Sequence, residues 1–332
     1  FDGGELTQKT ADGRVLNIKQ NMKDHTQAIE LVLKAMVDPV YGAIKSTDEI
    51  SAVGHRVLHS GEDFKSSVVI DDEVILICEK NAELGPLHMP GNIACIKSCR
   101  EVMPGVPMVA VFDTTFHSTM PAKAYMYGIP YSVYDQYKVR KYGFHGTSHK
   151  FVSEETIKLL GKKDSKIIVC HLGNGSSISA VKDGKCMDTS MGFTPLEGLV
   201  MGTRSGDIDP AASEFIRAKL GLTPEELVQY LNKKCGMLGV SELSSDMRDL
   251  EKGINEGNEK AKLAVEVAAY RIKKYIGSYA ATLNGVDAIV FTGGIGEHSD
   301  LMRRLVMEDM EYLGVDFDFE ANKKHEDGVR VI

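Results

Sequence analysis

Two charged residues of opposite sign stand where α/β enzymes place reacting groups. Arg56 lies inside the apolar run Ile50–Leu58, and Asp113 directly follows the apolar run Pro107–Phe112. A charged side chain in a buried strand is costly unless it is paired, and the carboxyl end of such a strand is where α/β folds bind ligands. Arg56 therefore either forms a structural ion pair or faces an anion, and the residues leave both interpretations open.

A second arginine and a histidine stand in glycine-rich segments. Arg204 lies shortly before a helix that Pro210 would open, and His145 is flanked closely by glycines. Two arginines, an aspartate and a histidine suit phosphoryl transfer, because in that reaction the protein mainly positions the reactants and neutralises charge. The alternative is that both arginines form ordinary surface ion pairs, which their spacing does not exclude.

His145 and His149 are four residues apart, a spacing that also occurs in zinc sites on helices. The zinc protease pattern requires a Glu beside the first histidine and a third ligand, and Gly146 occupies the Glu position. We therefore disfavour a metal site and interpret His145 as an imidazole open to a ligand oxygen. The alternative is that one of the two histidines caps a helix or packs in the core.

Two glycine-rich turns could hold a nucleotide. Gly173, Asn174 and Gly175 follow the run Lys166–Leu172, and Thr292–Glu297 follows Ala288–Phe291. Backbone amides at such turns can bind phosphate oxygens, and glycine permits close approach. Neither turn is a Walker motif or a dinucleotide fingerprint. Each turn alone would be a weak indication.

The hydrophobic pattern predicts a layered α/β protein of two domains, with a junction near Asp113–Thr115. Residues 114–144 show no regular period, the segment Phe1–Gln20 is polar and turn-rich, and Asp24 and Asp183–Gly184 predict a helix cap and a hairpin turn. The predicted helices are Thr26–Val37, Asp72–Leu84, Asn92–Met103, Ser148–Leu160, Pro210–Leu220, Pro224–Lys233, Asn258–Leu283 and Ser299–Tyr312. The predicted strands are Ile50–Leu58, Pro107–Phe112, Lys166–Leu172, Ser176–Lys182, Lys185–Ser190 and Ala288–Phe291. The segment Val329–Ile332 is interpreted as the start of a further strand.

Composition excludes several classes of partner. The net charge of −8 argues against a nucleic-acid or anionic-membrane surface, which would need clustered Lys and Arg. The longest apolar runs are far shorter than the roughly 20 residues of a membrane helix. The six cysteines form no C-x-x-C pair, which indicates a reducing cytoplasm. Because the first residue is Phe1 and not Met, we expect the natural start, and likewise the natural end, to lie outside this sequence.

Taken together, these segments resemble the acetate kinase family, within the superfamily of acetate and sugar kinases, heat-shock ATPases and actin. The resemblance runs through the whole chain in order. Its motifs are Gly54–Val57, Pro86–His88, Phe112–Thr114, Arg140–His149, His171–Ser177, Ser190–Gly198, Met201–Arg204 and Phe291–Glu297. It implies an α/β fold of two RNase H-like (actin-like ATPase) domains with the active site in the cleft between them. The domains would be residues 1–113, whose first strand and C-terminal return are absent from this sequence, and 114–332, which would bind nucleotide and form a homodimer.

The resemblance also implies roles for the acceptor side of the site. Arg56 and Arg204 would bind the carboxylate and stabilise the transferring phosphoryl group, Asp113 would orient the acceptor or hydrated Mg²⁺, and His145 would hydrogen-bond the phosphoryl group. The acetate pocket would be lined by Leu58, Leu87, Phe144 and Pro195, with His88 nearby. Leu58 stands where valine is common, and its extra methylene should favour a short acid by about 1–3 kcal/mol.

For the nucleotide, His171, Asn174 and Gly175 would form the phosphate turn. Asp246, Met247 and Arg248 would border the adenine and ribose, with Met247 covering a purine face, and Gly294 with Ile295 would complete the pocket. The resemblance implies ATP and ADP as substrates and Mg²⁺, or Mn²⁺, as cofactor. It places a first phosphate loop and the metal-binding carboxylate in segments beyond Phe1 and Ile332, so we expect no metal ligand in this chain.

The predicted function is therefore reversible transfer of the γ-phosphoryl group of ATP to acetate by direct in-line displacement. One alternative is a kinase for propionate or another short-chain carboxylate. The other is an inactive, truncated nucleotide-binding fragment, which the mass of the intact sample would reveal. No nucleic acid or membrane partner is expected.

Overall fold

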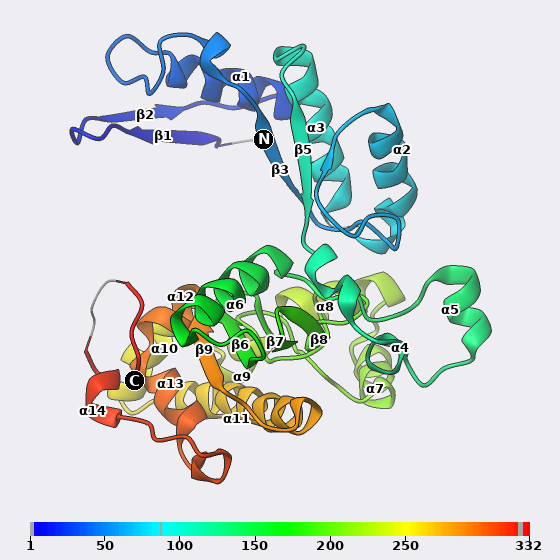
Figure 1. The fold of residues 1–332 in the computed structure, drawn as a ribbon, viewed down its shortest axis with the longest axis vertical. Helices are drawn as coiled ribbons and strands as arrows, with labels where there is room; N and C mark the ends of the chain where they lie inside the picture. The colour runs from blue at the N-terminus through cyan, green and yellow to red at the C-terminus, as the bar shows by residue number, and fades with distance from the viewer. Residues whose placement is uncertain (1–2, 87, 325–327) are drawn as a thin grey trace. The chain divides into compact units, whose positions relative to one another are not determined.

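The computed structural model describes residues 3–86, 88–324 and 328–332, and its chain divides into two compact units, Phe1–Thr115 and Phe116–Ile332 (Figure 1). Each unit has a sheet of its own with helices packed on it. None of the helices in these residue ranges is long and apolar enough to cross a bilayer.

The first unit is built on a three-stranded sheet in the order β3-β5-β4. Strand β3 (Val53–Val57) pairs in parallel with β5 (Met108–Phe112), and the short β4 (Val68–Val69) pairs with β5 in antiparallel. Asp24 caps α1 through a hydrogen bond from the Gln27 N–H, which confirms the predicted cap. The helical segments of the unit are α1 (His25–Met36), η1 (Thr47–Glu49), α2 (Asp72–Lys80), η2 (Asn81–Leu84) and α3 (Met89–Val102).

The opening residues form an antiparallel hairpin of β1 (Glu5–Lys9) and β2 (Val15–Lys19), which the sequence reading missed. In both strands only every second residue is half-buried, and the residues between are exposed and mostly polar. Two short strands with one weakly apolar face give little periodic signal, and this is why the hydrophobic pattern predicts only a polar, turn-rich segment here.

The second unit is built on a four-stranded sheet in the order β8-β7-β6-β9. Strands β6 (Lys166–Leu172) and β7 (Ser176–Lys182) have their predicted bounds, and β8 (Lys185–Thr189) follows β7 in a hairpin. Asp183 and Gly184 both have positive φ, +52° and +75°, as a type I′ turn requires. Strand β9 (Ala288–Thr292) pairs in parallel with β6, so the two strands end at the same edge.

Helices cover both faces of this sheet (Figure 1). Alternate residues of β6 point to opposite faces: Ile168 and Cys170 pack in the core that α11 (Glu259–Leu283) contributes to, whereas Ile167 and Val169 pack against α6 (Gly146–Leu160). Because both faces of β6 are buried, its sequence is a nearly continuous apolar run.

The remaining helical segments of the second unit are η3 (Thr115–Thr119, beginning at the division between the units), α4 (Ala122–Tyr125), α5 (Tyr131–Tyr137), α7 (Pro210–Leu220), α8 (Pro224–Lys233), α9 (Gly236–Ser241), α10 (Met247–Asn255), α12 (Gly293–His298), α13 (Asp300–Met307), η4 (Glu311–Leu313) and α14 (Phe319–Asn322). The bounds of α7 and α8 confirm the prediction. The predicted glycine-rich turn Thr292–Glu297 is confined to Gly293: Thr292 ends β9, and α12 begins directly after it, so the segment is not an extended loop. The predicted strand at Val329–Ile332 does not form.

Candidate active site

Arg56 and Asp113 form a two-point ion pair at the carboxyl edge of the first sheet. Arg56 Nε donates to Oδ1 of Asp113 at 2.9 Å, and Nη2 donates to Oδ2 at 2.7 Å. In the parallel register Val57 lies opposite Phe112, and the Asp113 N–H donates to the Val57 carbonyl at 3.0 Å. The strand pairing therefore brings the residue after β5 next to a side chain near the end of β3.

The two partners differ strongly in exposure. The Asp113 side chain is 2% exposed, whereas the Arg56 side chain is 70% exposed. The hydrogen bonds that Arg56 donates to Asp113 raise the pKa of its guanidinium, which stays charged. The ion pair considered from the sequence therefore forms, and the binding of an anion by the exposed part of Arg56 stays a prediction.

Four histidines gather in the second unit near the edge where β6 and β9 end: His117, His145, His149 and His171. His171 on β6 lies opposite Ser177 on β7 and Thr292 on β9. The Ser177 hydroxyl lies 2.8 Å from Nδ1 of His145 and 2.7 Å from Nε2 of His149. The His145 and His171 rings are 4.4 Å apart at their centroids. Both glycine-rich turns begin at this edge, so the histidines stand beside the predicted nucleotide turns.

The two histidines four residues apart have different environments. His149 is fully buried, and its Nδ1 lies 2.8 Å from the Ser179 hydroxyl, so both of its ring nitrogens are engaged by serines. Burial lowers the pKa of His149 well below its usual value, which keeps the ring neutral. Neither nitrogen is left for a metal ion. His145 is partly exposed and lies just before α6 with φ of +57°, a strained conformation for a residue with a side chain.

Arg204 lies against the backbone of the first glycine turn. A Cβ atom on Gly175 would stand 3.3 Å from Arg204 Nη1 and 3.6 Å from His145 Nε2. Arg204 Nη1 donates to the Pro195 carbonyl at 3.3 Å, but within the described residues Arg204 forms no ion pair. Burial lowers its pKa. A half-buried arginine without a carboxylate partner is costly unless an anion binds it, so the surface ion pair considered from the sequence does not form there.

A close backbone approach holds the Arg204 segment against this turn. The Gly202 N–H donates to the Asn174 carbonyl at 3.0 Å, and a Cβ atom on Gly202 would stand 2.0 Å from Asn174 Oδ1. Any larger residue at position 202 would push Asn174 away. Asn174 itself is exposed to solvent.

The second turn is the start of α12. Gly293 has φ of +78°, and a Cβ atom there would stand 2.7 Å from the Leu172 carbonyl at the end of β6. Gly294 is exposed with nothing within 4 Å of a Cβ position, and Ile295 is half-buried. Gly293 therefore makes the tight turn, while Gly294 leaves open space for a ligand.

The three residues predicted to border adenine open α10. Asp246 caps the helix through the Arg248 N–H at 2.9 Å, and the Arg248 guanidinium lowers the Asp246 pKa to about 2. Met247 is only 6% exposed and packs in the same core as Leu250. The prediction that Met247 covers a purine face does not fit this burial, because the helix directs its side chain inward.

The residues predicted to line an acetate pocket are spread over both units. In the first unit Leu58 is buried, with its Cδ2 atom 2.7 Å from a Cβ position on Gly85, and His88 is exposed. In the second unit Phe144 is buried and Pro195 is half-buried. Leu87 lies outside the described residues. The pocket itself therefore stays a prediction.

Sequence reasoning missed a half-buried, hydrogen-bonded pair, Tyr127 and Glu197. Tyr127 donates its hydroxyl hydrogen to Glu197 Oε2 and accepts a hydrogen bond from the Phe193 N–H at 2.8 Å. Burial raises the pKa of both side chains. A Cβ atom on Gly192 would overlap both of them. Tyr127 lies in the segment without periodicity, so its only signal was a carboxylate, Glu197, within an apolar motif.

Comparison with known proteins shows the family of this chain. The chain matches the model of the acetokinase family over residues 2–332. It is 58% identical over 323 residues to the acetate kinase of Desulfitobacterium hafniense, which covers 97% of this chain and 81% of that protein.

Two crystal structures have the same fold. The acetate kinase of Porphyromonas gingivalis matches with a TM-score of 0.95 and 45% identity, over 99% of this chain and 83% of that one. A propionate kinase from Francisella tularensis matches with a TM-score of 0.89 and 41% identity, over 94% of this chain and 80% of that one. With this likeness over almost its whole length, the chain belongs to the acetokinase family and has the α/β fold of these kinases.

Proposed function

We propose that this chain is a phosphotransferase with a carboxyl group as acceptor, which transfers the γ-phosphoryl group of ATP to acetate and gives acetyl phosphate and ADP. Its family, and its 58% identity to an acetate kinase, support this reaction. The observation that carries it within the chain is the position of Arg204 and His145 against the backbone of Gly175. A cation and an imidazole beside a glycine turn suit a transferring phosphoryl group.

Arg204 and His145 would act on the phosphoryl group. Arg204 has no carboxylate to neutralise it among the described residues, so its charge is available to the equatorial oxygens. The Ser177 hydroxyl, 2.8 Å from His145 Nδ1, fixes the orientation of the ring. With that nitrogen engaged, His145 Nε2 would donate a hydrogen bond to a phosphoryl oxygen.

Arg56 and Asp113 would act on the acceptor. Asp113 fixes the guanidinium of Arg56 through two hydrogen bonds, which limits the entropy lost when the arginine binds a carboxylate. The exposed part of Arg56 would bind one acetate oxygen and leave the other to attack the γ-phosphorus in line.

We also propose Mg²⁺, or Mn²⁺, as the cofactor. When bound, such an ion neutralises charge on the β- and γ-phosphate oxygens. Both Asp113 oxygens already accept hydrogen bonds from Arg56, but each retains a second lone pair. Because its carboxylate is 2% exposed, Asp113 would meet a hydrated ion only through a coordinated water that hydrogen-bonds to one of these lone pairs, and not as a direct ligand.

A propionate kinase is the second candidate, favoured by the 41% identity to the Francisella tularensis protein. Leu58 bears on the choice, because it is buried and tightly packed on Gly85. A side chain packed in this way can move little to make room for the extra methylene of a longer acid. We expect kcat/KM to be about tenfold or more higher for acetate than for propionate, because one methylene commonly gives discrimination of that size.

We further infer that the enzyme is cytoplasmic and a homodimer. Six free cysteines, three of them buried at 1% exposure or less, suit a reducing compartment. The dimer is the state expected for the family. Light scattering on a purified sample measures it.

The reaction is tested by trapping acyl phosphate as hydroxamate. The chain is incubated with ATP, Mg²⁺ and hydroxylamine, with and without acetate, and then with propionate and butyrate. The proposal predicts a product that requires both ATP and acetate and is largest with acetate. No product with any acid would overturn the kinase assignment, and a larger product with propionate would overturn the choice of substrate.

A further inference from the structure

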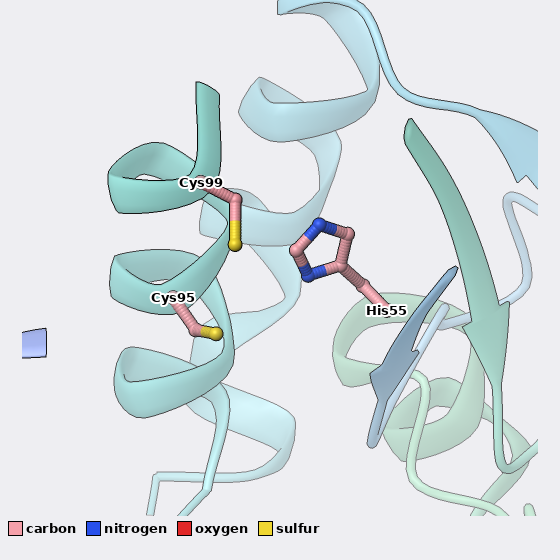
Figure 2. Close-up of side chains that lie close together, drawn as sticks. All are labelled: His55, Cys95 and Cys99. Atoms are coloured by element: carbon pink, nitrogen blue, oxygen red, sulfur yellow. The ribbon is translucent and has the colours of Figure 1, made fainter. Parts of the chain in front are cut away.

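A second group of ligating side chains lies within the first unit, between β3 and α3. Figure 2 shows His55 extending from β3 toward Cys95 and Cys99, which stand on successive turns of α3. One ring nitrogen and the two Sγ atoms all lie within 4.8 Å of one another. Among the residues that the structure describes, this is the one group of three His, Cys, Asp or Glu side chains that converges so closely.

The imidazole of His55 is poorly satisfied where it stands. His55 is 7% exposed, and its Nε2 atom is buried with no hydrogen-bond partner in the described chain. Leaving a buried polar atom unpaired costs about 1–3 kcal/mol. Consecutive residues of a strand point to opposite faces, so His55 is directed away from the Arg56 side chain and is not part of the Arg56–Asp113 site.

The two cysteines complete a soft ligand set. Residues four apart lie on the same face of a helix, so both sulfur atoms face β3. Cys99 is 6% exposed and Cys95 is half-buried, which leaves a route by which solvent reaches the group. Two thiols and an imidazole are the ligands of zinc and copper(I), and they do not suit Mg²⁺, which prefers oxygen ligands.

We propose that His55, Cys95 and Cys99 form a zinc site, with a water molecule as the fourth ligand. On binding, the two thiols release their protons to solvent, and two thiolates offset the charge of Zn²⁺. A buried neutral site results, whereas copper(I) would leave an uncompensated negative charge.

The geometry is close to what zinc needs. With Zn–S bonds of about 2.3 Å, two thiolates of a tetrahedral site lie about 3.8 Å apart. The two sulfur atoms, which lie within 4.8 Å of each other, therefore have to close by at most about 1 Å, which rotation of the cysteine side chains on the fixed helix can supply. The ion would join β3 to α3 directly behind Arg56, and its removal would loosen that strand.

The test uses the full chain, freed of metal by chelation and kept reduced by a phosphine reductant. Co²⁺ is titrated in and then displaced with Zn²⁺, because tetrahedral cobalt with thiolate ligands gives characteristic visible and charge-transfer bands. The proposal predicts one equivalent of cobalt, displacement by Zn²⁺, no competition from excess Mg²⁺, and a higher Tm with Zn²⁺. Cys95→Ser and Cys99→Ser should lose the bands and bind zinc at least about tenfold more weakly.

Two further variants distinguish loss of a ligand from a general effect on the fold. Cys78→Ser removes another buried thiol, on α2 and outside the group, and should keep the bands. His55→Gln with unchanged circular dichroism should shift or lose them. Bands absent from the unaltered chain, or kept in the Cys95→Ser/Cys99→Ser double variant, would overturn the proposal. Stoichiometric copper(I) binding without cobalt or zinc binding would also overturn it.

Discussion

The guanidinium of Arg56 donates two hydrogen bonds to the carboxylate of Asp113, from Nε to Oδ1 at 2.9 Å and from Nη2 to Oδ2 at 2.7 Å. Asp113 is almost completely buried, and Arg56 is mostly exposed. The pair is thus anchored from the inside of the first unit, and the arginine presents its outer edge. A lysine at position 56 could not reproduce this arrangement, because an ammonium group is not a planar fork.

Arg56→Lys should therefore lower kcat/KM for acetate by about 10–100-fold, since it keeps the charge but loses one of two hydrogen bonds to a buried carboxylate. Steady-state kinetics with acetate as the varied substrate measures the effect. Arg100→Lys is the matched control, because Arg100 forms an exposed ion pair with Asp72. Equal activity of the two variants would contradict the role given to Arg56.

Gly175→Ala should reduce activity without a large loss of stability. The added Cβ would stand 3.3 Å from Arg204 Nη1 and 3.6 Å from His145 Nε2, so it occupies the space beside both groups. Gly128→Ala is the control, because nothing lies within 4 Å of a Cβ there. We expect kcat/KM for ATP to fall by about tenfold or more in Gly175→Ala and to stay unchanged in Gly128→Ala. The urea midpoints of the two variants should be alike. An unimpaired Gly175→Ala enzyme would show that this space is not used.

Tyr127→Phe should destabilise the chain by about 1–3 kcal/mol, because it leaves the half-buried Glu197 carboxylate and the Phe193 N–H without the hydroxyl that joins them. Urea unfolding followed by circular dichroism measures the change. Tyr137→Phe, at an exposed tyrosine, should have no effect. A Tyr127→Phe protein as stable as the Tyr137→Phe protein would mean that solvent satisfies Glu197.

Only part of the fold and of the candidate site could be predicted from the sequence. The bounds of β6 and β7 and the turn at Asp183 follow from local patterns, because apolar runs and turn chemistry are read over neighbouring residues. The Arg56–Asp113 contact joins residues 57 positions apart and depends on strand register, so spacing alone left its partner undetermined. The burial of Met247 could not be predicted from the sequence pattern, because that pattern does not predict helix α10, which directs its side chain into the core.

The buried histidine His149 should make stability depend on pH in the acid range. Burial lowers its folded pKa, so below its unfolded pKa of about 6.5 the unfolded chain binds a proton that the folded chain does not. Its stabilising effect is complete above about pH 6.5 and declines below it, by up to about 1.4 kcal/mol per pH unit.

Urea unfolding of metal-free protein at several values between pH 5 and pH 8 measures this decline. His149→Asn should flatten the profile relative to the unaltered chain, because the titrating group is gone. His298→Gln, at an exposed histidine on α12, should keep the original profile. A profile that stays equally steep in His149→Asn would assign the effect to other groups.

The central claim is that Arg204 supplies positive charge to the transferring phosphoryl group. The most direct measurement is the rate of acetate-dependent hydroxamate formation by Arg204→Ala beside Arg217→Ala, whose arginine forms an ion pair with Glu214 on α7. We expect the rate to fall by a factor of about 10³–10⁵ in Arg204→Ala, as for arginines that contact a transferring phosphoryl group, and to stay at the wild-type value in Arg217→Ala. Equal rates in both variants, each folded, would contradict it.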